Sequence, residues 1–281
     1  MPNFDTSVPH IARVYDYWLG GKDNFAADRV LGDQTLQAYP NLVFSVRANR
    51  AFLARTVRFL AAEAGIRQFL DIGTGIPTAN NTHEVAQGVA PECRIVYVDN
   101  DPVVLSHARA LLTSKPEGAC AYIDADVRIP EKILAQAADT LDFGQPVALM
   151  LFTVLQFVTD DDEVGAIVNR LMDPFVPGSF LAISHPASDI DTEQHTEMVR
   201  RLNQSVAEKV ALRDRAGVAR LFDGFELIEP GVARAPEWRP DSEIEAASPA
   251  VLWGGVARKT RLGNASGRGL GEAVPPSWPA R

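Results

Sequence analysis

The chain has 281 residues, of which 46% are hydrophobic, so it is long enough to bury one large core with or without a small accessory unit. Its formal net charge of −9 argues against the class of proteins that hold nucleic acids on a basic surface. Enzymes and binding proteins for small molecules, peptides or proteins stay open as classes.

Cysteine use and hydropathy indicate a reducing, aqueous compartment. Cys93 and Cys120 are too few for a disulfide framework or a metal cluster, and we expect both to be small buried residues. The N-terminus lacks the basic-then-apolar pattern of a signal peptide. The longest apolar run, residues 147–158, contains Thr153 and Gln156 and is too short to span a bilayer. We therefore expect a cytoplasmic protein that is not bound to a membrane.

Residues 1–64 are expected to form helices that cap the rest of the chain. A first helix carries apolar residues on one face and ends before Gly20-Gly21, and residues 26–37 continue helically. Residues 41–64 form a long helix that ends at Gly65.

The first of these helices and the turn after it carry an unusual density of polar and aromatic side chains. One interpretation is a helix packed on the core with a solvated polar face, and the other is a lid over a ligand site. The segment Gly20-Gly21-Lys22 is not a phosphate loop, because Asp16 and Asp23 stand where that motif requires glycine and Ser or Thr. The crowded residues are His10, Arg13, Tyr15, Tyr17, Trp18, Lys22 and Asp23.

A glycine turn follows the first predicted strand. Residues 68–72 form a short buried strand with Asp71 near its end, and Gly73 and Gly75 let the backbone come close to a ligand before the next helix begins. The dinucleotide fingerprint needs a third glycine, but Thr78 stands at that position, after a proline. The Asp71 carboxylate disfavours a pyrophosphate and favours a cationic group such as an α-amino group.

Two further strands also end in acidic residues. Residues 94–99 end at Asp99, which can accept both hydrogen bonds from a ribose diol or can begin the next helix as its N-cap, a role that Asp101 also suits. Residues 121–126 end at Asp126, which is placed to accept from an exocyclic amine or to stabilise its own loop.

The remaining elements complete an α/β pattern. Residues 147–152 form the most apolar strand, which belongs at the centre of the sheet. The acidic residues 160–163 suit a helix N-terminus, and we expect no metal there. A fifth strand covers residues 180–184, residues 191–209 are helical, and the stretch from there to residue 217 is charged and expected to be exposed. Two closing strands follow at residues 225–229 and 250–258.

This order predicts a doubly wound, seven-stranded sheet with an antiparallel last strand and an N-terminal helical lid. We expect a cap over residues 1–64, a Rossmann-like core over 65–259 and a disordered tail over 260–281. The acidic trio Asp71, Asp99 and Asp126 suits a ligand with an ammonium, a ribose and an adenine amine but no phosphate, and S-adenosylmethionine has those groups.

Four segments together resemble an actinobacterial family of S-adenosylmethionine-dependent methyltransferases that was long carried as a domain of unknown function. They are residues 12–24 (ARVYDYWLGGKDN), 68–78 (QFLDIGTGIPT), 96–102 (VYVDNDP) and 255–259 (GVARK). The resemblance implies a class I, Rossmann-like methyltransferase fold, with the cofactor at the ends of the first strands and the N-terminal helices closing over it. Gln156 is a departure, because the resemblance implies a histidine there, and we expect no catalytic role at this position.

The resemblance also implies roles for single residues. Asp71, Gly73 and Gly75 would line the methionine part of the cofactor, Asp99 would take the ribose, and Asp126 with its neighbour would frame the adenine. The full set of expected cofactor-binding residues is Asp71, Gly73, Thr74, Gly75, Pro77, Thr78, Asp99, Asn100, Asp126, Val127, Thr153, Arg13, Tyr17, Gly21 and Lys22.

The chemistry of the acceptor is less defined by the sequence. Methyl transfer from a sulfonium depends on positioning, and a general base is needed only if the acceptor must lose a proton. His185, Tyr17 and His10 are the candidate bases. We expect a small-molecule acceptor and S-adenosylhomocysteine as product. A non-catalytic or regulatory protein that binds the cofactor is an alternative, and a nicotinamide-dependent oxidoreductase is a second one.

Overall fold

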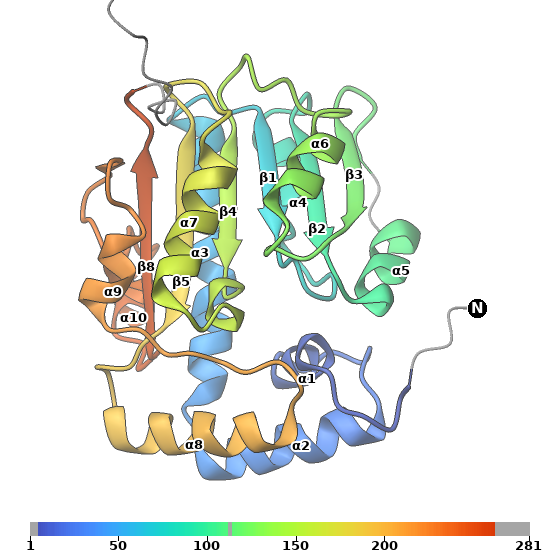
Figure 1. The fold of residues 1–281 in the computed structure, drawn as a ribbon, viewed down its shortest axis with the longest axis vertical. Helices are drawn as coiled ribbons and strands as arrows, with labels where there is room; N and C mark the ends of the chain where they lie inside the picture. The colour runs from blue at the N-terminus through green and yellow to red at the C-terminus, as the bar shows by residue number, and fades with distance from the viewer. Residues whose placement is uncertain (1–4, 112–113, 262–281) are drawn as a thin grey trace, which may run out of the picture.

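The structure, a computed structural model, describes residues 5–111 and 114–261 and is built on one eight-stranded sheet (Figure 1). The strand order is β3-β2-β1-β4-β5-β8-β6, with β7 pairing with β8 beside this path. β1 to β5 are parallel and β8 is antiparallel to its neighbours, which confirms the predicted doubly wound sheet. The strands are β1 (Gln68–Ile72), β2 (Arg94–Asp99), β3 (Ala119–Asp124), β4 (Ala148–Phe152), β5 (Phe180–Pro186), β6 (Glu226–Leu227), β7 (Ala233–Arg234) and β8 (Leu252–Arg258).

The closing strands differ from the prediction in length and number. The strand expected over residues 225–229 has only two residues, β6, and one further bond from Ile228 N to Val256 O (2.9 Å). Pro230 has no N–H to continue the ladder, and the chain turns at Gly231 and returns to β8 as the short strand β7. The sheet therefore has eight strands instead of seven.

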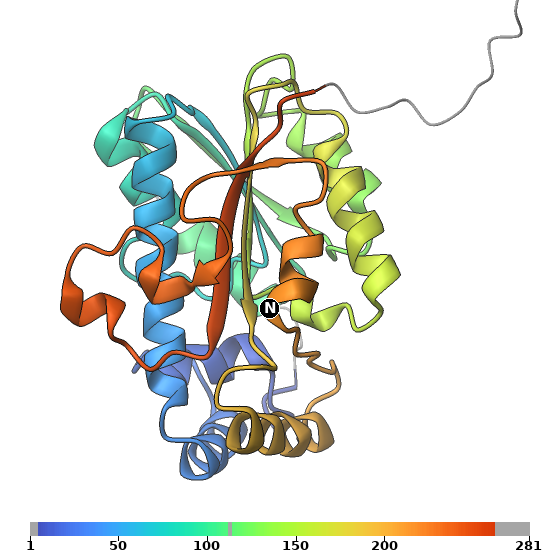
Figure 2. The ribbon, with the colours of Figure 1, turned by 90° about the vertical axis from the view of Figure 1, so that its left-hand side faces the viewer.

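Ten α-helices lie in the described residues, and most of them cover the two faces of the sheet (Figure 2). None of these helices is long and apolar enough to cross a membrane. They are α1 (Ile11–Trp18), α2 (Ala26–Ala38), α3 (Leu42–Ala62), α4 (Thr82–Val89), α5 (Pro102–Leu111), α6 (Pro130–Ala137), α7 (Asp161–Met172), α8 (Thr192–Ser205), α9 (Arg215–Arg220) and α10 (Glu243–Ala246), with short 3-10 helices at Leu155–Phe157 and Ala235–Glu237.

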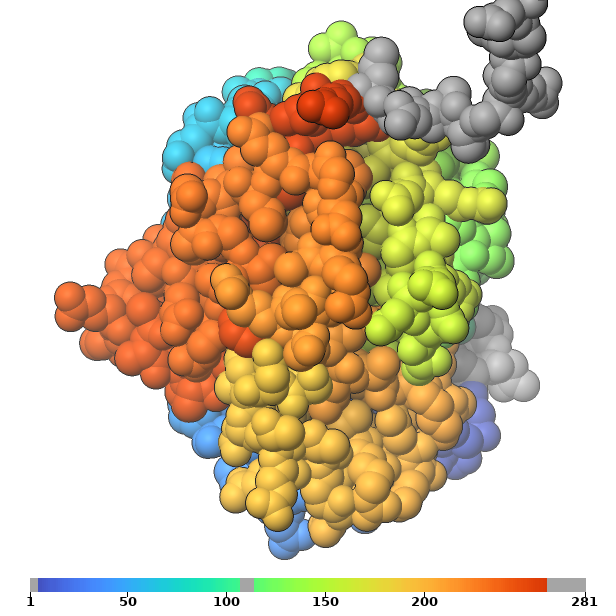
Figure 3. Space-filling model, turned by 60° about the vertical axis from the view of Figure 1, so that its left-hand side comes forward, coloured from blue at the N-terminus to red at the C-terminus, as the bar shows by residue number. Residues whose placement is uncertain are grey.

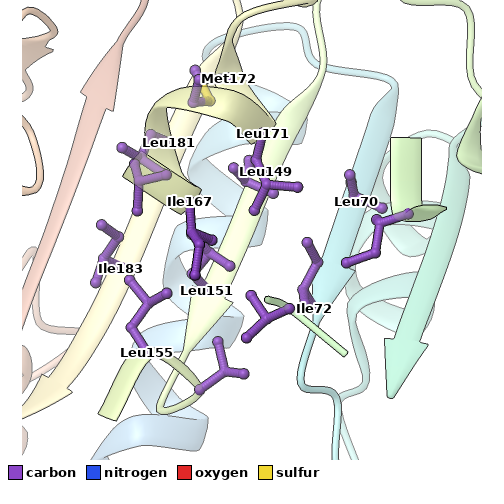
Figure 4. Close-up of a cluster of buried hydrophobic side chains, with 14 of the residues drawn as sticks. Leu70, Ile72, Leu149, Leu151, Leu155, Ile167, Leu171, Met172, Leu181 and Ile183 are labelled. Carbon is purple, nitrogen blue, oxygen red and sulfur yellow. The ribbon is translucent and has the colours of Figure 1, made fainter. Parts of the chain in front are cut away.

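The two faces of the sheet follow from the alternation of side chains along each strand. Phe69 of β1 packs in a cluster with α3 and α4, whereas Leu70 and Ile72 pack with α6 and α7. Figure 4 shows the second layer, where leucine and isoleucine side chains of β1, β4 and β5 meet Ile167 and Leu171 of α7. Each such side chain contributes about 1.5–3 kcal/mol when fully buried, so this packing holds the strands in the order that places their carboxyl ends side by side.

A third apolar cluster lies beyond the carboxyl ends of the parallel strands. There α1, α2 and α8 form a layer of helices, in which α2 and α8 lie side by side (Figure 1). Val14 of α1 and Leu31 of α2 pack in one cluster with Met198, Val199 and Leu202 of α8. We call α1, α2 and α8 the cap.

The cap differs in composition from the predicted segment 1–64. It includes α8, which lies much later in the chain, while the second half of α3, including Phe52 and Val57, packs in the cluster on the sheet face.

The charged stretch after α8, expected to be exposed, holds a buried residue, Arg213, which pairs with Asp161 (2.8 Å). Residues 262–281, most of the predicted tail, lie outside the described residues.

The long connection before β8 is anchored by Trp238. The indole is fully buried, with ring centroids 5.5 Å from Phe52 and 5.7 Å from Phe59. Arg55 of α3 donates to Trp238 O (3.0 Å) and Ala235 O (2.7 Å). Figure 3 shows the C-terminal part of the chain, in orange to red, covering one flank of the molecule next to α7 in yellow-green.

Candidate functional site

A pocket lies between the carboxyl ends of the strands and the cap, and we call it the first pocket. It encloses about 960 Å³ of empty space, part of which is open to solvent. Residues from the ends of β1, β2 and β4 and from the loop after β3 form its floor, and α1 and α3 close it from the other side. Nine of the predicted cofactor-binding residues line it: Asp71, Gly73, Thr74, Gly75, Asp99, Asn100, Asp126, Val127 and Thr153.

The two turn glycines have left-handed backbones with different surroundings. Gly73 has φ +75°, and a Cβ there would lie 2.5 Å from the Val154 side chain, so only glycine fits between β1 and the loop after β4. Gly75 has φ +64°, and a Cβ there would meet nothing within 4 Å. Gly75 N donates to Asp99 Oδ2 (2.9 Å) and thereby ties the turn to β2. The turn presents an open backbone face to the first pocket.

Asp71 and Asp99 are both buried carboxylates with few partners. Thr82 Oγ1 donates to Asp71 Oδ2 (2.5 Å), while Asp99 accepts from Gly75 N and from Asp101 N (2.9 Å each). Burial raises the pKa of each carboxyl from 3.8 to about 6, because the charged forms lose solvation. A ligand that brings a positive charge or hydrogen-bond donors would stabilise the ionised forms of both.

Asp126 is engaged by its own loop. It accepts from Arg128 Nη1 (2.7 Å) and from Arg128 N (2.8 Å), and Asn100 Nδ2 lies 3.4 Å from its Oδ2. Arg128 also donates to Phe157 O (2.7 Å), which connects the loop after β3 to the loop after β4. Both interpretations of Asp126 therefore stay open, since an engaged carboxylate keeps lone pairs for a ligand amine.

The other six predicted cofactor residues do not line the first pocket. Pro77 lines a small neighbouring pocket, and Thr78 N donates to Asn81 Oδ1 (3.1 Å) at the start of α4. Of the four cap residues, Arg13 pairs with Asp28, and Tyr17 donates to Asp33 (2.6 Å). Gly21 and Lys22 belong to a turn that wraps around the buried carboxylate of Asp16, which accepts from Asp23 N (2.9 Å) and Asn24 Nδ2 (2.8 Å).

The three candidate bases lie in different places. His10 lines the first pocket, with its Nδ1 2.9 Å from Asp101 Oδ2, and this interaction raises its pKa. Tyr17 lies outside the pocket. His185 is fully buried between Pro186 O (3.0 Å) and Arg213 Nη1 (2.8 Å), and burial lowers its pKa to about 3.

Several pocket residues were not in the predicted set. Asn49 Nδ2 donates to Tyr15 Oη (3.0 Å) and to Thr153 Oγ1 (3.1 Å), and Ser184 Oγ donates to Asn49 Oδ1 (2.6 Å). This network holds Thr153 at φ +47°, an uncommon conformation for a branched residue. A buried asparagine inside an amphipathic helix gives no sequence signal of this kind.

Arg50 also lines the first pocket, next to Asn49 on α3. Its Nη2 donates to Ala79 O and Asn80 O (3.2 Å each), so α3 lies close to the loop that follows the glycine turn. The sequence signal was ambiguous, because α3 carries arginines on several faces.

The acidic run at residues 160–163 begins α7 as expected. Asp160 accepts from Asp162 N (3.0 Å) and Glu163 N (2.8 Å), an N-cap arrangement. Within residues 5–111 and 114–261, no group of three or more His, Cys, Asp or Glu side chains is placed to hold a metal ion.

The strand order and the antiparallel β8 are those of the class I methyltransferase fold. The sequence model of the family described as S-adenosyl methyltransferase matches residues 1–260, and the chain belongs to that family. It is therefore an S-adenosylmethionine-dependent enzyme, as the resemblance implied, and the nicotinamide alternative is wrong.

Solved structures support this assignment. The chain is 44% identical to a DUF574 family protein from Streptomyces avermitilis (TM-score 0.87; 91% of this chain and 99% of that chain covered). It is also 44% identical to a candidate methyltransferase from Thermobifida fusca (TM-score 0.84; 92% and 98% covered). A SAM-dependent methyltransferase from Anabaena variabilis shares the fold at 11% identity (TM-score 0.50; 89% and 95% covered). No curated protein matches the chain.

Proposed function

We propose that the chain transfers the methyl group of S-adenosylmethionine to a small-molecule acceptor, with the cofactor held in the first pocket. The observation that carries this proposal is the placement of Asp71 and Asp99, which line one pocket with the open face of the Gly75 turn. Both carboxylates have raised pKa values, so both gain from a ligand with an ammonium group and hydroxyl donors.

The residues present fit the parts of this cofactor. Asp71 would take the α-ammonium and Asp99 the ribose hydroxyls, while Asn100 and Asp126 would lie at the adenine. Arg50 would face the α-carboxylate, which is supported by its Nε, a buried donor without a hydrogen-bond partner among the described residues. The set leaves the α-ammonium and the α-carboxylate of the cofactor each with a partner of opposite sign.

The contribution of the protein is mainly to bind and to orient the cofactor. S-adenosylmethionine, when bound, supplies a methyl group on a positively charged sulfur, which is reactive toward a nearby nucleophile. The buried network of Tyr15, Asn49 and Thr153 fixes one wall of the first pocket. His10 is held by Asp101, which favours its protonated form, so we assign no general base to the chain.

Calorimetric titration with S-adenosylhomocysteine tests the proposal. We expect Asp99→Ala to weaken binding by about 1–3 kcal/mol, because the ribose hydroxyls lose an ionised acceptor. Asp124→Ala is the matched control, since Asp124 pairs in register with Asp99 on β3 but is exposed and outside the pocket. A folded wild-type protein that does not bind S-adenosylhomocysteine, or equal affinities for the two variants, would contradict the proposal.

A further inference from the structure

A second pocket continues from the first, away from the glycine turn. It holds about 590 Å³ of empty space, part of it open to solvent. Five residues line both pockets: Ile11, Tyr15, Asn49, Thr153 and Gln156. A molecule in the second pocket would therefore lie next to a cofactor in the first pocket, at the residues that line both.

The lining of the second pocket is apolar and carries no net charge. Met198, Val199 and Leu202 of α8 face Leu42 and Val46 of α3, and none of the lining residues is Asp, Glu, Lys or Arg. An ion placed here would lose its hydration without gaining a partner of opposite charge.

The one lining residue that titrates in the ordinary range is His195, and its burial favours the neutral imidazole. Its Nδ1 lies 2.9 Å from Ala187 O, its ring lies against Tyr39, and burial lowers its pKa. A neutral imidazole does not change the preference of the pocket for uncharged molecules.

Gln156 supplies a polar group with no partner at the shared wall. Its side chain is 8% exposed, and its Oε1 is buried without a hydrogen-bond partner among the described residues. Asn49, by contrast, donates both of its amide hydrogens, to Tyr15 and Thr153, and its Oδ1 accepts from Ser184. A buried acceptor left unpaired has lost its hydrogen bonds to water, so a ligand that donates an O–H or N–H to Gln156 removes that penalty and binds more tightly.

We propose that the second pocket binds the methyl acceptor, and that this acceptor is an uncharged, largely apolar small molecule with one O–H or N–H group that donates to Gln156 Oε1. This inference rests on the proposed function, because it assigns the acceptor side of the same site. Gln156 is a positioning and specificity residue, since an amide is too weak a base to remove a proton at neutral pH.

Fluorescence titration with 2-naphthol as probe tests this assignment, on protein saturated with S-adenosylhomocysteine and on protein without it. Naphthalene has the same rings without the donor, and 2-naphthoate adds a charge. We expect 2-naphthol to bind about tenfold more tightly than naphthalene, because it makes one additional hydrogen bond, to Gln156 Oε1. We expect 2-naphthoate to bind more weakly than both. Tighter binding of 2-naphthoate would overturn the uncharged class.

Variants locate the probe. Gln156→Leu should bring the affinity for 2-naphthol down to that for naphthalene, and an unchanged preference would overturn the role of Gln156. Val199→Trp should fill the pocket and abolish 2-naphthol binding while S-adenosylhomocysteine still binds. Val30→Trp, the same change at an exposed position of α2, is the control.

Val199 lies in the core of the cap, so Val210→Phe, at another buried wall residue, serves if Val199→Trp does not fold. Unchanged 2-naphthol binding in a folded wall variant would overturn the proposed pocket. The two proposals are tested by different results. A wild-type protein that does not bind S-adenosylhomocysteine would contradict the proposed cofactor site. The proposed acceptor site is tested by 2-naphthol binding, which is also measured in the absence of S-adenosylhomocysteine.

Discussion

His10 Nδ1 lies 2.9 Å from Asp101 Oδ2, and the two form an ion pair when the imidazole is protonated. His10 immediately precedes α1 of the cap, whereas Asp101 immediately precedes α5 and accepts from Val103 N (2.8 Å) in its first turn. The pair therefore joins the cap to the edge of the sheet beside the first pocket. Asp99 adds to the field at His10, and Arg13 opposes it.

The His10–Asp101 pair should stabilise the fold in a pH-dependent way. Because the pKa of His10 is raised in the folded protein, the contribution is complete below the unfolded value of about 6.5 and is lost as the pH rises through the folded value. The side chain of His10 is 36% exposed, so solvent screening keeps the loss in His10→Ala below about 1 kcal/mol. Thermal unfolding of the wild type and of His10→Ala, measured at about pH 6 and at about pH 9, should show the variant to be less stable only at about pH 6. An equal difference at both values would assign the effect to packing.

Cofactor affinity should fall below about pH 6. Asp71 and Asp99 have pKa values raised to about 6, so each carboxyl is only about one-tenth ionised at pH 5. Protonation of each one should therefore weaken S-adenosylhomocysteine binding at pH 5 by up to about tenfold relative to pH 7.5. The unliganded protein should respond in the opposite direction, because its folded form binds more protons than the unfolded form between about pH 4 and 6 and loses stability as the pH rises. Calorimetry and thermal unfolding across this range measure the two effects. Asp99→Asn should remove part of both, and an affinity that does not change with pH would contradict the buried, ionised carboxylates.

The sequence was sufficient to predict the sheet, because each parallel strand is a short apolar run and two of them end in acidic residues that no core position would favour. It was not sufficient for the cap. Met198, Val199 and Leu202 lie on one face of a helix whose other residues are mostly polar or charged, and only the packing against α1 and α2 shows that this face is buried.

Within the site, too, some residues could be located from local sequence and others could not. Gly73, Gly75 and Asp99 are adjacent to strand ends, so their location follows from local sequence. Asn49 and Gln156 come together only through the tertiary fold, since they lie on α3 and on the loop after β4. Arg13 of α1 was also predicted at the cofactor, but its guanidinium pairs with Asp28 of α2 inside the cap.

Arg50 should contribute to cofactor affinity through its charge. Arg50→Met keeps most of the aliphatic stem but removes the guanidinium that lines the first pocket, and we expect S-adenosylhomocysteine to bind about tenfold more weakly. Arg47→Met is the matched control, one turn earlier on α3 at an exposed position outside the pocket. Calorimetric titration of the two variants separates a local contact from net charge, because equal losses would show that only the overall charge matters.

The two turn glycines should respond differently to alanine. Both have positive φ, which costs alanine about 1 kcal/mol, but at Gly73 the added methyl group also overlaps Val154, which adds about 1–3 kcal/mol. Gly73→Ala should therefore lose more stability in urea unfolding than Gly75→Ala. Gly75→Ala should instead weaken S-adenosylhomocysteine binding in calorimetry, because its methyl group enters open space at the first pocket. Equal losses of stability in the two variants would mean that the loop carrying Val154 moves aside. The overlap with Val154 would then not explain why glycine is required at position 73.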